Sequence, residues 1–154
     1  RMYKRYTHEG GVATPLIVHW PDGFKARGDL RHAPSNIIDV APTCLSAAGL
    51  SVKGMAGKSL VPVFAKDSEK QRTLYWEHEG NRAVRKGNYK LVSMHDTPWE
   101  LYDMNKDRSE LKDLSKIMPG KAKELRLLYE AWAKRVGALP WNEVLEARKK
   151  KIAK

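Results

Sequence analysis

Two of the five histidines share one local setting, a glutamate and then a glycine directly after them: His8-Glu9-Gly10 and His78-Glu79-Gly80. An imidazole can donate or accept hydrogen bonds, and the amide of Asn81, shortly after His78, can do both at once. His78 and Asn81 could therefore bind polar groups of an organic substrate. The alternative is that residues 77–81 form a polar turn that fixes strand geometry, and the residue types leave both interpretations open.

Lys4 lies just before the first of these blocks. A lysine ammonium is a compact charge that can neutralise anionic oxygens, although by residue type alone Lys4 is an ordinary loop lysine. We expect Glu9 to accept hydrogen bonds from backbone N–H groups near Gly10 and Gly11. Paired glycines permit backbone conformations closed to other residues, or a close approach of another segment.

Most other catalytic signatures are absent from the sequence: it contains no phosphate-binding loop, no HExxH, no GxSxG and no paired-cysteine site. Cys44 is the only cysteine and lies in an apolar helical stretch, so we expect a buried structural thiol. Residues 45–50 offer no base that would activate it as a nucleophile.

The formal charge of +11 is concentrated at the C-terminus, because residues 148–154 hold five basic side chains and no acidic one. Such a short tail is typical of a solvated, frayed helix end, and no groove-reading motif supports a nucleic-acid partner. No apolar run approaches the roughly 18 residues that a membrane span requires. We therefore expect neither nucleic-acid nor membrane binding.

The first half of the chain predicts a buried strand and a helix. Residues 16–20 form an apolar run ended by Pro21, as in strands buried on both faces of a parallel sheet. The chain offers too few strands to complete such a sheet, so we expect an N-terminal portion to provide them. A helix over 37–48, closed by Gly49, follows, and the charged stretch 66–71 predicts a subdomain boundary.

The second half predicts an antiparallel meander with one covered face. Its four expected strands cover residues 73–78, 82–85, 89–94 and 99–103. Apolar residues then recur at helical spacing over 121–136, which predicts a helix that packs on the sheet and ends at Gly137. A shorter helix is expected after Pro140. The three tryptophans at 76, 99 and 132 are expected in the core.

Several segments follow one another in a fixed order: Lys4 to Gly11, Thr14-Pro15-Leu16-Ile17, His19-Trp20-Pro21, Ile38 to Thr43, Gly57-Lys58-Ser59-Leu60-Val61-Pro62, Trp76 to Arg85, and Trp99-Glu100-Leu101-Tyr102-Asp103. In this order they resemble the C-terminal part of the type I sulfatases, from about residue 4 to 141. The resemblance implies hydrolysis of sulfate esters, with Lys4 at the position of a lysine that contacts the sulfate group.

In that family the nucleophile is a formylglycine made within a C/S-x-P/A-x-R motif, beside a divalent cation, usually calcium. No such motif occurs in this sequence, and the metal ligands near the family's N-terminus have no counterpart. The resemblance therefore implies a parent enzyme that uses calcium and formylglycine, with no metal site and no cofactor in this chain. Alone, the chain is expected to be inactive.

These observations predict an α/β fold of the alkaline-phosphatase and sulfatase type. Residues 1–68 would form the end of the catalytic domain, at the edge of its large mixed sheet. Residues 69–154 would form a small four-stranded antiparallel sheet packed by a long helix, with the basic tail.

The expected function is that of an arylsulfatase-like fragment, with Lys4 catalytic and Lys4, His78 and Asn81 binding substrate. Its partners would be an aryl or carbohydrate sulfate ester and the N-terminal portion of the enzyme. The sequence leaves open whether the protein forms an oligomer. The parent would be periplasmic or secreted. Two alternatives remain: a non-catalytic binding or oligomerisation module derived from a sulfatase, and a phosphonate or phosphate monoester hydrolase of the same superfamily.

Overall fold

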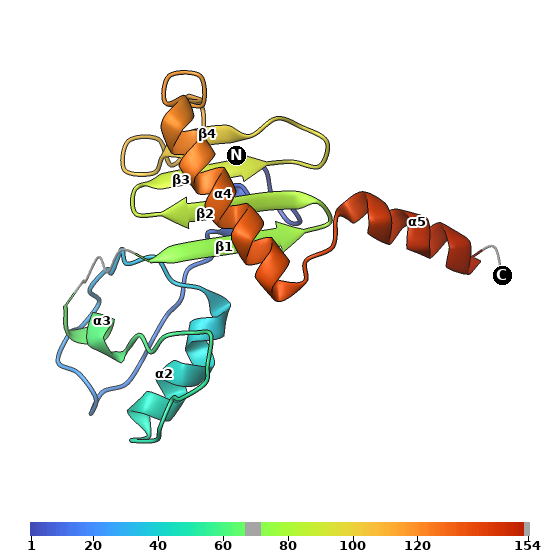
Figure 1. Cartoon of the computed structure of the whole chain (residues 1–154). Helices are drawn as coiled ribbons and strands as arrows, with labels where there is room; N and C mark the ends of the chain where they lie inside the picture. The colour runs from blue at the N-terminus through green and yellow to red at the C-terminus, as the bar shows by residue number, and fades with distance from the viewer. Residues whose placement is uncertain (67–71, 153–154) are drawn as a thin grey trace. The chain divides into compact units, whose positions relative to one another are not determined.

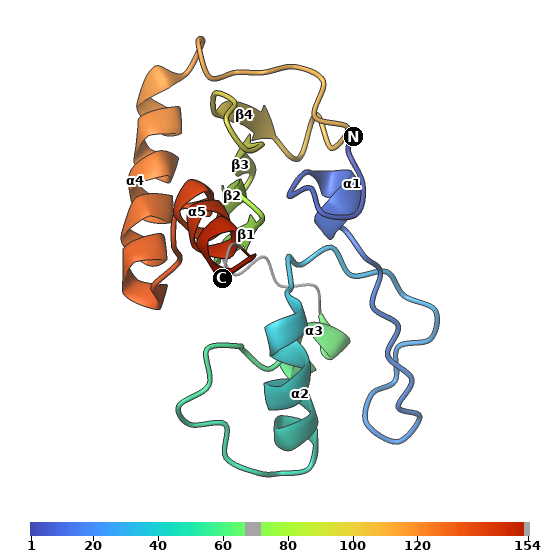
Figure 2. The ribbon, with the colours of Figure 1, turned by 90° about the vertical axis from the view of Figure 1, so that its right-hand side faces the viewer.

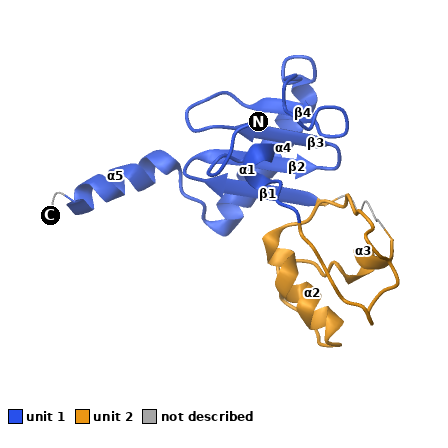
Figure 3. Ribbon diagram, turned by 180° about the vertical axis from the view of Figure 1, so that it is seen from behind, with its two compact units in different colours: residues 1–15, 73–154 blue, residues 16–72 orange. Residues whose placement is uncertain are grey.

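The computed structural model describes residues 1–66 and 72–152 of the chain (Figure 1). They form two compact units: unit 1 contains Arg1–Pro15 and Thr73–Lys154, and unit 2 contains Leu16–Arg72 (Figure 3). The predicted boundary between residues 68 and 69 lies outside the described residues. Residues 1–15 belong to unit 1 together with the sheet. The predicted division into residues 1–68 and 69–154 refers to the domains of a complete enzyme, and it remains a prediction.

Unit 1 is built on a four-stranded antiparallel meander in the order β1-β2-β3-β4: β1 (Thr73–His78), β2 (Asn81–Lys86), β3 (Tyr89–Ser93) and β4 (Glu100–Asp103). Register pairs His78 with Asn81 and Lys86 with Tyr89, so two-residue turns join the first three strands. Glu79 and Gly80 both have positive φ, at 52° and 80°, as tight hairpin turns require. The predicted meander is confirmed.

One face of this sheet is covered by α4 (Pro119–Val136) (Figure 1). The buried core between them contains Val84, Leu91, Leu101, Leu125 and Tyr129, with Trp99 and Trp132 packed against it. The expected apolar stripe therefore meets the sheet. Gly137 closes the helix in the left-handed conformation at φ 71°, as predicted. Helix α5 (Trp141–Ile152) follows, and none of its residues is buried.

The opposite face is covered as well, which corrects the expectation of one covered face. Ala83, Val92, Tyr102 and Met104 form a second buried cluster there. Residues 1–12, including the short helix α1 (Glu9–Val12), lie on the side of the sheet away from α4 (Figure 2). The sequence pattern missed this layer because Lys90, a charged residue, points into it and is 0% exposed.

Unit 2 contains the 3-10 turn η1 (Ile37–Asp39), α2 (Val40–Ala47) and α3 (Val61–Ala65). The strand predicted over residues 16–20 is not formed, and the side chain of Ile17 is 90% exposed. The reason is physical: a strand needs a hydrogen-bonded neighbour, and the described part of residues 16–72 contains no strand. Cys44 is exposed on α2, so the expected buried thiol is wrong.

The helical part of unit 2 is organised around the carboxylate of Asp39, which is 0% exposed. It accepts hydrogen bonds from the backbone N–H groups of Asn36 and Lys58, both at 2.8 Å, and pairs with Arg72. Burial opposes its charge, but Arg72 and the two N–H donors hold the pKa of Asp39 below its usual value.

None of the helices that the structure describes combines the length and the apolar character needed to cross a membrane.

Candidate functional site

Lys4 lies in the loop that leads into α1, with an exposed side chain and a backbone φ of 57°. Its ammonium forms no ion pair or hydrogen bond with any residue in the described ranges 1–66 and 72–152. The charge is therefore available to an external anion. A left-handed φ is uncommon for a residue with a Cβ and persists where surrounding contacts fix the backbone.

Gly10 and Gly11 supply those contacts through close packing. A Cβ atom at Gly10 would lie 2.0 Å from the carbonyl oxygen of Met2, and one at Gly11 would lie 1.9 Å from that of Tyr6. No side chain fits at either position, because real Cβ contacts are never that short. The glycine pair therefore allows the close approach of another segment, one of the two roles predicted for it. That segment is residues 1–8, here called the N-terminal loop, which folds back onto α1.

A buried ionic cluster fastens this layer to the sheet. Glu9 accepts hydrogen bonds from Lys90 Nζ at 3.1 Å and from Arg108 Nη2 at 3.2 Å, while its own backbone N–H donates to Glu110 at 2.9 Å. Lys90 also pairs with Glu110 at 2.9 Å, and both of these side chains are 0% exposed. Burial disfavours the charged form of Glu9, yet Lys90 and Arg108 hold its pKa below the usual value.

Glu9 accepts hydrogen bonds, as expected, but the expected donors were wrong. Its carboxylate binds the side chains of Lys90 and Arg108 and not backbone N–H groups near the glycines. Residues 90, 108 and 110 were missed as parts of this cluster. The available signal was a lysine between the apolar positions of β3, since a charge in a covered strand requires a buried partner.

A second group holds the start of the chain. Arg1 pairs with Glu100, and the hydroxyl of Tyr102 donates to the same carboxylate at 2.9 Å. The Nε2 atom of the fully buried His8 lies 3.4 Å from Glu100 Oε2. Burial lowers the pKa of His8, against the attraction of Glu110 and Glu100, and thereby favours the neutral form of the imidazole.

The turn between β1 and β2 meets the N-terminal loop. The Asn81 amide donates to the carbonyl of His78 at 2.9 Å and to that of Arg5 at 3.5 Å. Arg5 also forms an ion pair with Glu79 at 3.5 Å. His78 itself is exposed at the end of β1. The residue directly after Lys4 thus contacts the turn that carries His78, and the predicted site residues share one corner of unit 1.

Asn81 differs from the other two predicted residues, because it is 4% exposed and its amide nitrogen donates to two backbone carbonyls. This supports the interpretation of residues 77–81 as a geometric turn, with Gly80 N–H donating to Glu77 Oε1 at 3.0 Å.

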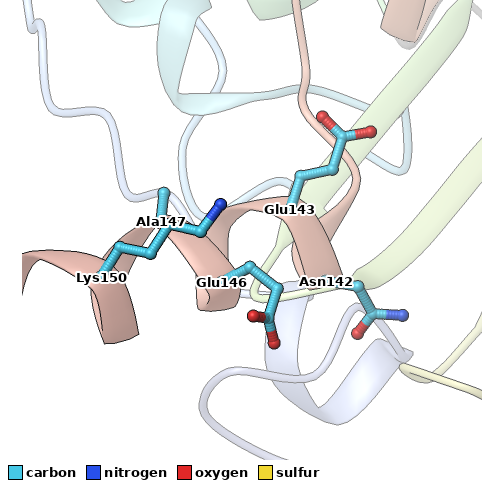
Figure 4. A pocket seen from close by; sticks show the side chains of 5 residues that line it. All are labelled: Asn142, Glu143, Glu146, Ala147 and Lys150. Carbon is cyan, nitrogen blue, oxygen red and sulfur yellow. The ribbon is translucent and has the colours of Figure 1, made fainter.

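A surface hollow lies elsewhere in unit 1, along α5. It is lined by Asn142, Glu143, Glu146, Ala147 and Lys150, all from this one helix (Figure 4). None of the predicted site residues lines it, so it does not extend the candidate site.

Metal ligands are not assembled in the part of the chain that the structure describes: no three His, Cys, Asp or Glu side chains there are grouped to hold an ion. The acidic residues near the candidate site, Glu9, Glu100 and Glu110, are paired with lysine or arginine. The sulfatase resemblance implies calcium ligands in an N-terminal portion of the parent enzyme, so the described residues do not test that expectation.

Comparison with known proteins gives one consistent result. Residues 2–127 match the family model "N-sulphoglucosamine sulphohydrolase, C-terminal". An uncharacterized sulfatase of Schizosaccharomyces pombe is 32% identical to the chain, over 85% of the chain and 27% of that protein. The chain thus spans about a quarter of the length of the curated relatives it matches.

Two solved structures resemble the chain in fold and sequence. The structure of Ps i-CgsB has a TM-score of 0.65 and 26% identity, covering 75% of this chain and 27% of that one, and it is also known in complex with k-i-k-neocarrahexaose. BT4656, in complex with its substrate D-glucosamine-2-N,6-O-disulfate, has a TM-score of 0.52 and 28% identity, covering 66% and 24%. The chain therefore belongs to the N-sulphoglucosamine sulphohydrolase C-terminal family, and its fold is that of the C-terminal part of a sulfatase.

Proposed function

We propose that this chain is the C-terminal portion of an arylsulfatase-like sulfuric-ester hydrolase that acts on aryl or carbohydrate sulfates. The observation that carries the proposal is the position of Lys4. In a chain matched to the sulfatase family over residues 2–127, this lysine is exposed, unpaired among the described residues, and joined through its neighbour Arg5 to the turn of His78.

In this proposal Lys4 acts directly on the sulfate group. Its ammonium neutralises charge on the sulfate oxygens and on the leaving oxygen as the S–O bond breaks. Such a group is effective when it is held in place before substrate arrives. The packing of Gly10 and Gly11 and the buried pairing of Glu9 restrict the loop backbone and support this role.

His78 and Asn81 are proposed to contribute to substrate binding in different ways. The exposed imidazole of His78 can hydrogen-bond hydroxyl groups of the organic part of the ester. The amide of Asn81 already donates to the carbonyls of His78 and Arg5. Its proposed contribution is therefore to hold the N-terminal loop beside His78.

The chain alone is proposed to be inactive. Neither a C/S-x-P/A-x-R motif nor a group of metal ligands is present among the described residues, so formylglycine and a divalent cation, calcium, would belong to an N-terminal portion of the enzyme. Exposed apolar side chains in unit 2, such as Ile17 at 90% and Leu16 at 54%, support such a partner. The parent enzyme is proposed to be periplasmic or secreted.

A stand-alone, non-catalytic module is the second candidate function. The absence of a nucleophile motif favours it, whereas the exposed apolar residues of unit 2 argue against it, because a free-standing module would cover them.

The test joins the chain to the N-terminal portion of a sulfatase and measures hydrolysis of an aryl sulfate. Lys4→Ala is expected to lower turnover by about 10²- to 10³-fold, the usual effect of removing one group that stabilises developing negative charge. Lys106→Ala, an exposed loop lysine of the same unit, is the matched control and should leave turnover unchanged.

Three other results would overturn the proposal. Equal turnover in the Lys4→Ala and Lys106→Ala variants would remove Lys4 from the site. An inactive joined protein that binds sulfated sugars would favour the non-catalytic module, and faster hydrolysis of a phosphate monoester than of the sulfate would favour the phosphatase relative.

A further inference from the structure

The C-terminal half of α5 carries a dense and exposed positive charge. Arg148, Lys149, Lys150 and Lys151 are consecutive, and all four are exposed. Successive residues of an α-helix are rotated by about 100°, so four consecutive cations surround the helix instead of lining one face. A single flat surface could therefore not cover all four cations at once.

Little of this charge is neutralised within the chain. Lys149 pairs with Glu146 at 2.8 Å, and the Arg148 guanidinium lies 4.9 Å from the centre of the Trp141 ring. Lys150 and Lys151 form no ion pair with any residue that the structure describes. Cations near a helix C-terminus are stabilised by the helix dipole, but that interaction is worth only about 0.3–1 kcal/mol, and the like charges of Arg148 and Lys151, one turn apart, repel each other.

Helix α5 begins beside the turn of the candidate site. A Cβ atom at Gly80 would lie 3.0 Å from Cβ of Trp141, the first residue of α5. Gly80 is in the same turn as His78 and Glu79, and Glu79 pairs with Arg5 next to Lys4. Helix α5 thus starts beside this turn, and its basic end, residues 148–151, lies about 10–15 Å further along the helix axis.

We propose that the basic end of α5, residues 148–151, is a docking site for an anionic polysaccharide that carries several sulfate groups. The inference rests on the proposed function for the class of ligand, because a sulfated polymer bound at Lys4 and His78 would present further anionic groups to neighbouring surfaces. Charge complementarity selects this ligand over an uncharged glycan. The lysines bind as point charges without fixed geometry, so they fit irregularly spaced sulfates.

The test is a titration of the full chain with dextran sulfate, with uncharged dextran as the chemical control. Binding to dextran sulfate only is expected, and it should weaken steeply as salt rises from about 20 to about 150 mM. Lys150→Gln combined with Lys151→Gln should weaken binding by about fivefold or more, because two unpaired cations are lost. Lys106→Gln combined with Lys112→Gln removes the same charge from loop positions of unit 1 and should change binding less than twofold.

Equal weakening in the two double variants would overturn the proposal, because net charge and not α5 would then determine binding. Equally tight binding of an oligothymidylate of matched charge would also overturn it, in favour of a nucleic-acid partner. In the joined enzyme, the α5 double variant should leave turnover of a small aryl sulfate unchanged, whereas Lys4→Ala lowers it. Failure of docking and failure of the proposed function are thereby distinguished.

Discussion

Unit 1 and unit 2 are each stabilised internally by a different kind of interaction. Every residue of the buried apolar core belongs to unit 1, in which α4 and residues 1–12 cover the two faces of one sheet. Within the described part of residues 16–72, the buried residues are Asp39 and Pro42. Large apolar side chains of unit 2 are instead exposed: Leu16, Ile17, Val18, Leu30, Ile37, Ile38, Leu50, Val52 and Met55.

This difference indicates which part of the chain is complete in itself. Burial of apolar surface is the main stabilising contribution to folding, and unit 1 has a core of its own. Unit 2 relies on the polar contacts of Asp39, which satisfy hydrogen bonds but add little net stability. We infer that unit 1 is the stable scaffold of the candidate site, and that unit 2 requires a further apolar surface.

The largest effect is expected for Lys90→Met in unit 1. The substitution leaves Glu9 and Glu110 buried without their shared cation, and removing one partner of a buried ion pair costs about 3–5 kcal/mol. Urea unfolding followed by tryptophan fluorescence measures the loss. Lys86→Met, which breaks the exposed pair with Glu124, should cost less than about 1 kcal/mol. Similar losses in both variants would contradict the scaffold interpretation.

A core truncation compares the two units directly. Leu101→Ala removes a side chain that is 0% exposed and should lower the free energy of unfolding by about 2–5 kcal/mol. Leu50→Ala, at a position 59% exposed in unit 2, should change it by no more than about 0.5 kcal/mol. If Leu50→Ala proved as costly, unit 2 would possess a core of its own.

A smaller effect is expected from pH, and it should be confined to unit 1. The pKa of the buried His8 is lowered, so below about pH 6.5 the unfolded chain binds a proton that the folded chain does not. Stability should therefore fall as pH drops from about 7.5 to about 5.5. Further acidification adds to the loss as Glu9 and Glu100, whose pKa values are lowered, become protonated.

The His8 contribution is isolated by His8→Gln, which should flatten the profile between these two pH values, with unfolding measured at each. The charged groups that face His8 are Glu100, Glu110, Arg1 and Lys90. A profile unchanged by His8→Gln would assign the pH dependence to these groups instead.

The smallest effect is expected for Ile17→Lys in unit 2. Since Ile17 is 90% exposed, the free energy of unfolding should change by no more than about 0.5 kcal/mol. Self-association, measured by analytical ultracentrifugation, should decrease, because an exposed apolar residue is lost. Loss of folded protein in this variant would show that Ile17 is buried in solution.

The sequence predicted unit 1 better than unit 2 for a physical reason. Alternating apolar residues in the strands and the stripe containing Leu125 and Tyr129 are local patterns that are completed within unit 1. The apolar run 16–20 carries an equally clear strand pattern, but the described part of unit 2 contains no strand that could pair with it, and residues 16–19 are exposed. An apolar sequence pattern shows that a segment can form a strand, but the strand forms only where a second strand is available to pair with it.

The residues of the candidate site could be predicted from the sequence, but the buried ion pairs that hold its loop in place could not. Lys4 and His78 were identified through a family resemblance, and the structure places the Lys4 loop against the His78 turn through Arg5. The buried Glu9–Lys90 pair, which fastens the N-terminal layer to the sheet, joins residues distant in sequence. No local pattern encodes such pairs, because the preference of an isolated lysine or glutamate is for solvent.

The contacts of the N-terminal residues have a consequence for the order of folding. The backbone nitrogen of Arg1 donates to the carbonyl of Ser109, and the backbone N–H of Glu9 donates to Glu110, so the second layer of unit 1 closes across a span of about a hundred residues. Closing so long a loop is entropically unfavourable, and contacts between distant residues slow folding. We therefore expect the contacts of Arg1 and Glu9 with residues 109 and 110 to form late in folding, after the more local pairing of the β1–β4 meander.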